Sequence, residues 1–251
     1  MCLIAWNWQP QSLTPLLLVA NRDEYYARPT QPLHWWADAD ILAGRDLQAG
    51  GSWLGVSRNG RLAALTNHRS PVVQRADAPS RGELVSQFLR SSAPAAEFLK
   101  ALTDHAAAYN PFNLLVFDGQ KLLGLEGRHA RVVELTPGVH AVSNAEFDTP
   151  WPKLVALQEK LQTRLDQGLT TDTELLALLH DTQSAPDHLL PDTGVALALE
   201  RQLSATFVTL PDYGTRASSV VRLHTTHGSF LEQTFSAEGA GQRAVFSWNW
   251  A

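Results

Sequence analysis

"CLIAWNW" (residues 2–8) and "PLLLVAN" (15–21) flank the polar stretch "QPQSLT" (9–14). Both are short apolar runs bounded by turn-forming residues, a pattern typical of buried β-strands. We expect them to pair as antiparallel neighbours. In that arrangement the end of the second strand lies beside the start of the first, so residues 21–24 are predicted to stand next to Cys2.

The rest of the chain alternates between groups of strands and groups of helices. Helices are predicted at 80–90, 94–108, 152–167 and 171–182. Further strands are predicted at 53–57, 61–67, 112–118, 121–127, 131–135, 138–144, 205–210, 218–226, 228–235 and 244–250. Strands in blocks and helices in blocks indicate an α+β layered fold rather than alternating βαβ units.

Three local signals support these boundaries. The pair Asn59-Gly60 between two apolar runs predicts a β-hairpin with a primed turn. Ser80 is followed three residues later by Glu83, and Thr171 by Glu174, so each pair predicts a capping box at the start of a helix. No low-complexity linker, repeat or composition break divides the sequence, so we expect one domain over residues 1–251.

Composition excludes several classes of protein. The net charge is −5 and no Lys- or Arg-rich run is present, so nucleic-acid binding is not expected. The apolar run "PLLLVA" is far too short to span a membrane, and no signal peptide is predicted. One cysteine allows neither an internal disulfide nor a CxxC metal site. A cytoplasmic protein is the simplest expectation; its oligomeric state is left open.

Cys2 is the residue that most clearly raises the possibility of chemistry. It stands directly after the initiator Met1, and it is the chain's only cysteine. A buried strand cysteine is one interpretation. The other is that removal of Met1 exposes a thiol with a pKa of about 8.5 on the same residue as an α-amine with a pKa of about 8, which is a competent base.

Charged and amide side chains are predicted to lie around this cysteine. Arg22 could lower the pKa of a Cys2 thiolate, and Asp23 or Glu24 could orient the α-amine. Asn67 and Asn144 each end a predicted strand; they are either turn residues or donors to an oxyanion. A further fixed cation, on a glycine turn, is Arg216 in "YGTR" (213–216). The histidines stand in no metal-ligand motif.

Motifs along nearly the whole chain resemble the NRDE family, the group that includes the transport-and-Golgi-organisation 2 proteins. The resemblance lies in "MC", "ANRDEYYARPT", "GRDLQAGGSWLG", "LTNHR", "SRGELV", "NPFNLL", "SNAEFDTPWPK", "PDTG" and "YGTR", in this order. It implies an N-terminal-nucleophile (Ntn) hydrolase-like, four-layer αββα sandwich, with two antiparallel sheets between layers of helices.

The more distant resemblance to cysteine Ntn hydrolases concerns individual residues. Members of that superfamily cleave non-peptide amides such as bile-salt conjugates and penicillin V. The resemblance implies that Cys2 is the nucleophile, and it matches the Arg and Asp positions after the second strand to Arg22 and Asp23. It also matches later site positions. These are Asn67, Asn144 and Arg216.

Two functions of different class remain open from the sequence. The first is an amidohydrolase that acts through Cys2 on a small non-peptide amide with an apolar part, which requires no cofactor; the pair Trp35-Trp36 could line its acyl pocket. The second is a non-catalytic carrier of haem or an acyl lipid, in which Cys2, His34 or His68 could ligate iron. The second rests on the haem trafficking and lipid homeostasis linked to the family.

Overall fold

The first sheet has six antiparallel strands in the order β10-β1-β2-β11-β12-β13. The structure is a computed structural model that describes residues 2–69 and 74–250. The strands of this sheet are β1 (Cys2–Trp8), β2 (Leu16–Tyr25), β10 (Gly138–Val142), β11 (Tyr213–Leu223), β12 (His227–Ser236) and β13 (Gly239–Asn249). The predicted pairing of the first two segments is confirmed, because β1 and β2 are antiparallel neighbours.

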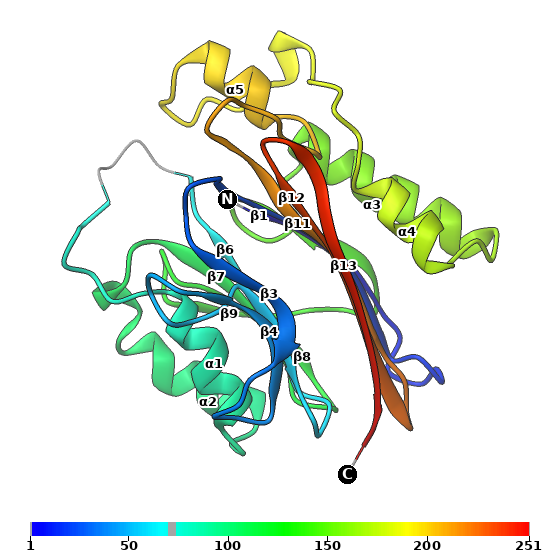
Figure 1. Cartoon of the computed structure of the whole chain (residues 1–251). Coiled ribbons are helices and arrows are strands. Elements are labelled where there is room, and N and C mark those ends of the chain that lie inside the picture. The colour runs from blue at the N-terminus through cyan, green and yellow to red at the C-terminus, as the bar shows by residue number, and fades with distance from the viewer. Residues whose placement is uncertain (1, 70–73, 251) are drawn as a thin grey trace.

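The second sheet is an antiparallel meander of seven strands in chain order. Its strands are β3 (Thr30–Trp35), β4 (Ile41–Asp46), β5 (Leu54–Ser57), β6 (Leu62–Asn67), β7 (Phe112–Phe117), β8 (Leu122–Glu126) and β9 (Arg131–Glu134). The two sheets face each other, and helices lie on the outer side of each (Figure 1). This is the predicted αββα arrangement.

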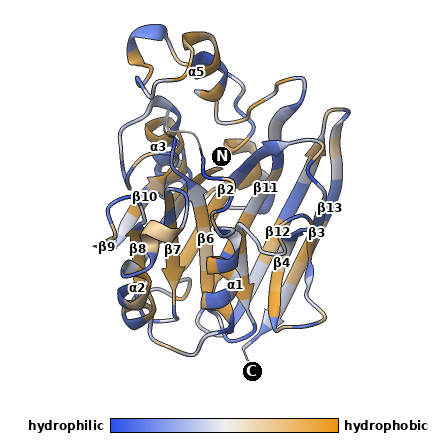
Figure 2. Ribbon diagram, turned by 90° about the vertical axis from the view of Figure 1, so that its left-hand side faces the viewer, coloured by the Kyte–Doolittle hydropathy of each residue, from blue (hydrophilic) through white to orange (hydrophobic). Residues whose placement is uncertain are grey.

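Helices cover the two outer faces. Against the second sheet lie α1 (Gly82–Arg90) and α2 (Ala95–Thr103), and against the first lie α3 (Pro152–Asp166) and α4 (Asp172–Leu178). A fifth helix, α5 (Leu197–Leu203), lies at the end of the molecule that holds the N-terminus (Figure 2). Short 3₁₀ turns occupy Ala106–Ala108 and Asp187–Leu189. None of the helices among the described residues is long and apolar enough to cross a membrane.

Side-chain alternation along the strands builds three apolar layers. In β1, Ile4 and Trp6 enter the core between the sheets, whereas Leu3 and Ala5 pack toward α3 and α4. A third apolar cluster fills the space between the second sheet and α1 and α2. Cys2 belongs to the cluster between the sheets, so its side chain faces the interior of the sandwich.

Two turn and cap predictions need correction. The hairpin at Asn59-Gly60 forms, but only Gly60 has a positive φ (81°), so the turn is not primed. Instead Gly60 N–H donates to Ser57 O and Ser57 N–H to Arg61 O, as in a three-residue loop with a left-handed glycine. The capping box at Thr171 and Glu174 is confirmed. The one at Ser80 is wrong, because Arg81 occupies the N-cap of α1 without a side-chain cap.

Other differences lie at the edges of the fold. The predicted strand 205–210 is not a strand; only Thr209 pairs, through an isolated bridge to Gly214. The strands β3 and β4 were not predicted. Pro32 interrupts the apolar pattern of β3, and it is tolerated because β3 is an edge strand whose register shifts between Gln31 and His34. The second predicted strand, which was expected to end at residue 21, is also longer, since β2 continues to Tyr25.

Candidate active site

Cys2 and Arg22 are register partners at the open end of the β1–β2 pair. Directly opposed residues of antiparallel strands share one face of the sheet, so both side chains face the space between the sheets. Glu24 lies on the same face two residues on, with Oε2 3.8 Å from the Arg22 guanidinium. Asp23 alternates to the face covered by α3. The hairpin therefore brings two of the three predicted charged residues, Arg22 and Glu24, to the face of the thiol.

The thiol of Cys2 is buried, with 7% of the residue exposed. Burial raises its pKa; the charges of Asp23 and Glu24 raise it further, and the charge of Arg22 lowers it. At neutral pH the group is therefore a thiol that needs a base before it can act as a nucleophile. The predicted removal of Met1, which would supply that base, lies outside the described residues.

Two residues of the neighbouring strand β11 form hydrogen bonds to Asp23. Its Oδ1 accepts a hydrogen bond of 2.8 Å from Thr215 Oγ1, and its main-chain oxygen accepts one of 3.0 Å from the Tyr213 hydroxyl. Burial raises the pKa of this carboxyl, and the charge of Lys153 opposes the shift. Glu24 differs, because it is partly exposed among arginines. The two carboxylates, which the sequence left as alternatives, thus have different surroundings.

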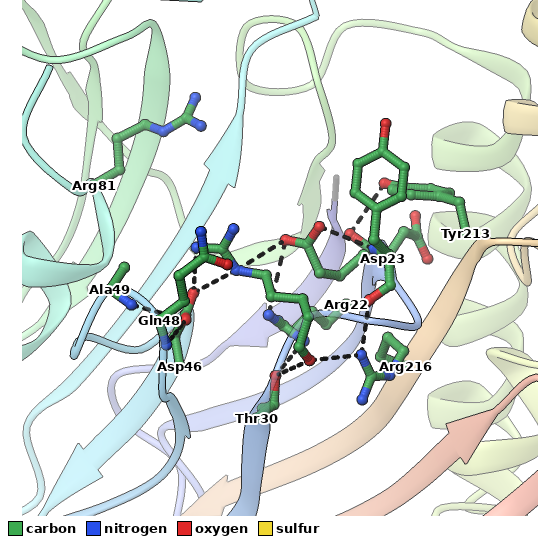
Figure 3. A network of polar contacts seen from close by, with 12 residues as sticks. Arg22, Asp23, Thr30, Asp46, Gln48, Ala49, Arg81, Tyr213 and Arg216 are labelled. Atoms are coloured by element: carbon green, nitrogen blue, oxygen red, sulfur yellow. Dashed lines mark hydrogen bonds and ion pairs between the residues drawn. The ribbon is translucent and has the colours of Figure 1, made fainter. Parts of the chain in front are cut away.

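A cleft of about 300 Å³ opens over Cys2. Arg22 and Asp23 lie on one side of it and Arg81 on the opposite side (Figure 3), and Glu24 also lines it. Its walls also include Thr30, Asp46, Trp53, Asn67, the loop around 49–52 and the segment 78–82. The cleft is more polar and more charged than the predicted acyl pocket. Trp35 and Trp36 are not among the residues that line it, so their predicted place at the site is wrong.

Asn67 lines the cleft, whereas Asn144 is buried in the protein interior. Asn67, at the end of β6, lines the cleft with Cys2. Asn144 is fully buried; its Nδ2 donates a hydrogen bond of 2.8 Å to Asn67 O, and its Oδ1 accepts one of 3.2 Å from Ser143 Oγ. Ser143 Oγ also lies 3.1 Å from Cys2 O, so its single proton is shared between Cys2 O and Asn144 Oδ1. The segment after β10 therefore fixes the backbone of both cleft residues.

Arg216 lies at a β-bulge of β11 and does not line the cleft with Cys2. Its Nη1 donates to the main-chain oxygens of Tyr25, Tyr26 and Arg28 at 2.8, 3.0 and 3.1 Å. The guanidinium thereby holds the turn that follows β2. It also borders a neighbouring cavity of about 200 Å³ between the two sheets, which shares Arg22 and Trp53 with the cleft.

Lys153 and Arg69, which line a small separate cavity together, are buried cations that the sequence analysis did not single out. Lys153, in the first turn of α3, is 4% exposed, and burial lowers its pKa to about 8. The charges of Asp23 and Cys2 raise that pKa, so the ammonium lies within electrostatic range of both. Arg69 forms a buried ion pair of 2.5 Å with Glu200. The feature of the sequence that could have pointed to Lys153 is its position directly after Pro152, where an amphipathic helix begins.

Haem-ligating groups are scarce around the cleft. Neither His34 nor His68 lines it, and His34 Nδ1 is 2.7 Å from Pro32 O. Within residues 2–69 and 74–250 no group of three or more His, Cys, Asp or Glu side chains could hold a metal ion. The donor set of the cleft therefore offers a haem iron one ligand, the sulfur of Cys2.

Comparison with solved structures defines the class of fold. The chain is similar to a conjugated bile acid hydrolase from Clostridium perfringens, with a TM-score of 0.55, 9% identity and coverage of 98% of this chain and 92% of that chain. An N-acylethanolamine-hydrolyzing acid amidase ortholog from Caenorhabditis elegans gives a TM-score of 0.50 at 10% identity, over 87% of this chain and 92% of that chain. The fold is therefore that of the Ntn hydrolases.

Sequence comparison defines the family. Residues 1–237 match the family described as "Transport and Golgi organisation 2". The Transport and Golgi organization protein 2 homologs of Bos taurus and Homo sapiens are 35% and 33% identical, and each alignment covers 93% of this chain and 93% of the relative. The chain belongs to the transport and Golgi organisation 2 family.

Proposed function

We propose that this protein is an Ntn-type cysteine amidohydrolase that cleaves a small non-peptide amide. The observation that carries the proposal is the position of Cys2. The chain's only thiol stands at the first residue of β1, opposite Arg22, at the base of a 300 Å³ cleft that Asn67 also lines. The names of the two solved structures, a bile acid hydrolase and an acid amidase, support a reaction at a C–N bond.

The reaction requires removal of Met1. The free α-amine of Cys2 then accepts the thiol proton while Sγ forms a bond to the amide carbonyl carbon. As the C–N bond breaks, the α-amine passes the proton to the leaving nitrogen, and the acyl group stays on Cys2 as a thioester. Water then adds to the thioester carbonyl, the C–S bond breaks, and the carboxylic acid leaves with the thiol restored.

The surrounding side chains have separate roles in this proposal. The Asn67 amide lines the cleft beside the thiol and donates to the oxyanion. Asn144 acts through Asn67, whose main-chain oxygen it binds, and is a positioning residue. Arg22 stabilises the thiolate and Asp23 orients the α-amine. Arg216 is a positioning residue for the turn after β2.

The neighbouring cavity is suited to the apolar part of the predicted substrate. Its 200 Å³ space is bordered by apolar side chains of both sheets as well as by polar ones. The apolar contributors are Pro32, Trp53, Ala217 and Phe235. Because it shares Arg22, Thr30, Gly44 and Trp53 with the cleft, one ligand can extend from Cys2 into it. We place this activity in the cytoplasm, as the sequence predicts.

The test is hydrolysis by protein whose first residue is Cys2. A panel of N-acyl amides that vary in acyl length and amine is incubated with this protein and with Cys2→Ala, and release of the amine is measured. We expect release by the wild-type chain and none by Cys2→Ala. A matched protein with an N-terminal extension before Cys2 should be folded and inactive. Equal release by all three proteins, or by none across the panel, would contradict the proposal.

A carrier of haem or an acyl lipid is the second candidate. The observation in its favour is the cavity of about 200 Å³ beside the cleft, which apolar side chains of both sheets border. Titration with haem should then give a saturable Soret change that Cys2→Ala alters. A spectrum indifferent to Cys2→Ala would remove iron ligation by this residue.

A further inference from the structure

Arg81 differs from the other arginines of the cleft in its partners. Arg28 forms an ion pair of 2.7 Å with Asp46, and Arg45 one of 3.2 Å with Asp38. The Arg81 guanidinium instead donates to two neutral oxygens, Pro111 O at 3.1 Å and Gln74 Oε1 at 3.2 Å. Within residues 2–69 and 74–250 no carboxylate lies at ion-pairing distance from it. Arg81 therefore brings a positive charge to the cleft that no acidic side chain neutralises.

The backbone that carries Arg81 is fixed at the rim of the cleft. Ser52 N–H donates to Gly82 O at 3.2 Å, and Gly51 packs so closely on Gly82 that an added Cβ would lie 2.3 Å from Gly82 C. This contact joins the start of α1 to the loop at 49–52. The backbone at Arg81 is therefore fixed, and the bonds to Pro111 O and Gln74 Oε1 hold the guanidinium itself.

Arg81 lines the same cleft as Cys2 and Glu24. Burial lowers the pKa of its guanidinium, and negative charge on either of those two side chains raises it. The guanidinium has five N–H donors, and its two bonds to neutral oxygens leave others for a ligand. An arginine with free donors in a half-buried site is well suited to bind a carboxylate.

We propose that Arg81 binds a carboxylate of the substrate, so that the site selects an amide that carries an acidic group close to the scissile bond. The inference rests on the proposed function of the same cleft and adds the class of substrate. The acidic group lies toward Arg81, the scissile carbonyl at Cys2, and the apolar part in the neighbouring cavity. Arg81 is the specificity-determining residue of this arrangement.

The test uses alkylation of Cys2 and needs no turnover. Iodoacetate and iodoacetamide are similar in size and differ in charge. With either reagent the Cys2 sulfur forms a bond to the methylene carbon, iodide leaves, and the thiol proton passes to the buffer. The chain has one cysteine, so intact mass reports this reaction alone. The ratio of the two rates cancels changes in thiol reactivity and isolates the preference for a carboxylate.

We expect the iodoacetate-to-iodoacetamide ratio to be higher for the protein than for N-acetylcysteine, and Arg81→Gln to lower it about tenfold, the loss of one charged hydrogen bond. Arg81→Lys should retain part of the preference. Arg243→Gln, which removes an exposed arginine of β13, should leave the ratio unchanged. Equal ratios for wild-type and Arg81→Gln protein, or a wild-type ratio equal to that of N-acetylcysteine, would overturn the inference.

A measurement on the wild-type chain alone guards against misfolding of the variants. N-Acetylglycine and the neutral N-acetylethanolamine are compared as protectants of Cys2 against iodoacetamide. We expect N-acetylglycine to protect at about tenfold lower concentration; equal protection would overturn the inference. If neither amide is hydrolysed although N-acetylglycine protects better, the proposed reaction fails and the carboxylate site stands.

Discussion

The side-chain amide of Asn144 donates a hydrogen bond of 2.8 Å to the main-chain oxygen of Asn67. Asn144 follows β10 in the first sheet, and Asn67 ends β6 in the second. The bond therefore joins the two sheets at the end where Cys2 lies. Ser143, the preceding residue, donates to Cys2 O. One short segment thus sets the position of the nucleophile relative to the amide that is proposed to stabilise the oxyanion.

Asn144→Asp tests this connection. The substitution replaces a donor with an acceptor that faces the Asn67 oxygen in a fully buried position, so one oxygen loses its partner. We expect a loss of about 2 kcal/mol in the free energy of unfolding, measured by urea denaturation. Asn249→Asp on exposed β13 is the matched control and should change stability little. Equal stabilities of the two variants would argue against the role of this bond.

Arg22 and Asp23 should shift the pKa of Cys2 in opposite directions. Burial is the main cause of its raised pKa; beyond that, Arg22 lowers it and Asp23 raises it. Arg22→Gln is therefore expected to move the alkylation midpoint of Cys2 to higher pH and Asp23→Asn to lower pH. The measurement is the rate of iodoacetamide labelling against pH.

The exposed Arg243 provides the control for this pair, since Arg243→Gln changes the net charge far from Cys2. Shifts of the same sign for Arg22→Gln and Asp23→Asn would contradict the arrangement of charges around the thiol.

Glu232 should make stability depend on pH. This carboxyl lies in β12 against the cavity beside the cleft, and burial raises its pKa from 4.5 to about 7, while the Leu33 N–H and the charge of Arg22 lower it. Between these values the folded chain holds a proton that the unfolded chain has released, so stability falls as pH rises. The total loss is at most about 3 kcal/mol.

Glu232→Gln removes this titration and keeps an oxygen to accept from Leu33 N–H. We expect the variant to gain stability relative to the wild type on going from about pH 5 to about pH 8, measured by urea denaturation at both values. Glu97→Gln, which changes an exposed carboxyl of α2, should show the same pH dependence of stability as the wild type. A constant difference between Glu232→Gln and the wild type across this range would show that the carboxyl does not titrate there.

Gly51 is predicted to be irreplaceable at the rim of the cleft. A Cβ there would lie 2.3 Å from Gly82 C and 2.4 Å from Gly82 O, and main-chain atoms cannot move aside without displacing α1. Gly51→Ala should lower the free energy of unfolding by about 3 kcal/mol. At Gly82 the nearest atom to an added Cβ is Ser52 O at 3.1 Å, so Gly82→Ala should cost less. The reverse order in denaturation experiments would contradict this packing.

Local patterns predicted the strands that build the sandwich and failed where long-range contacts decide the structure. Short apolar runs bounded by turn residues located β1, β2 and most other strands. They did not reveal β3, whose apolar pattern Pro32 interrupts, or β4, and pairing within the second sheet stabilises both. Residues 205–210 have strand-like composition, but their partner is a single bridge at Gly214.

The part of the site that the β1–β2 hairpin forms could be predicted from the sequence. Antiparallel pairing alone brings Arg22 beside Cys2. By contrast, Arg81 directly precedes α1 and Lys153 lies in the first turn of α3, so their positions near Cys2 depend on tertiary packing and not on the hairpin. The actual contacts of Asn144 and Arg216, which are main-chain oxygens, likewise depend on tertiary packing.

The mass of untagged protein purified from its native host, after exposure to an activated acyl ester, tests the central claim most directly. We expect the chain to lack Met1 and to carry one acyl group on Cys2, with no acyl group on the Cys2→Ala variant. That result requires both a free α-amine and a nucleophilic thiol on one residue. Quantitative retention of Met1, or a processed chain that never acquires an acyl group, would contradict the claim that Cys2 is a catalytic nucleophile.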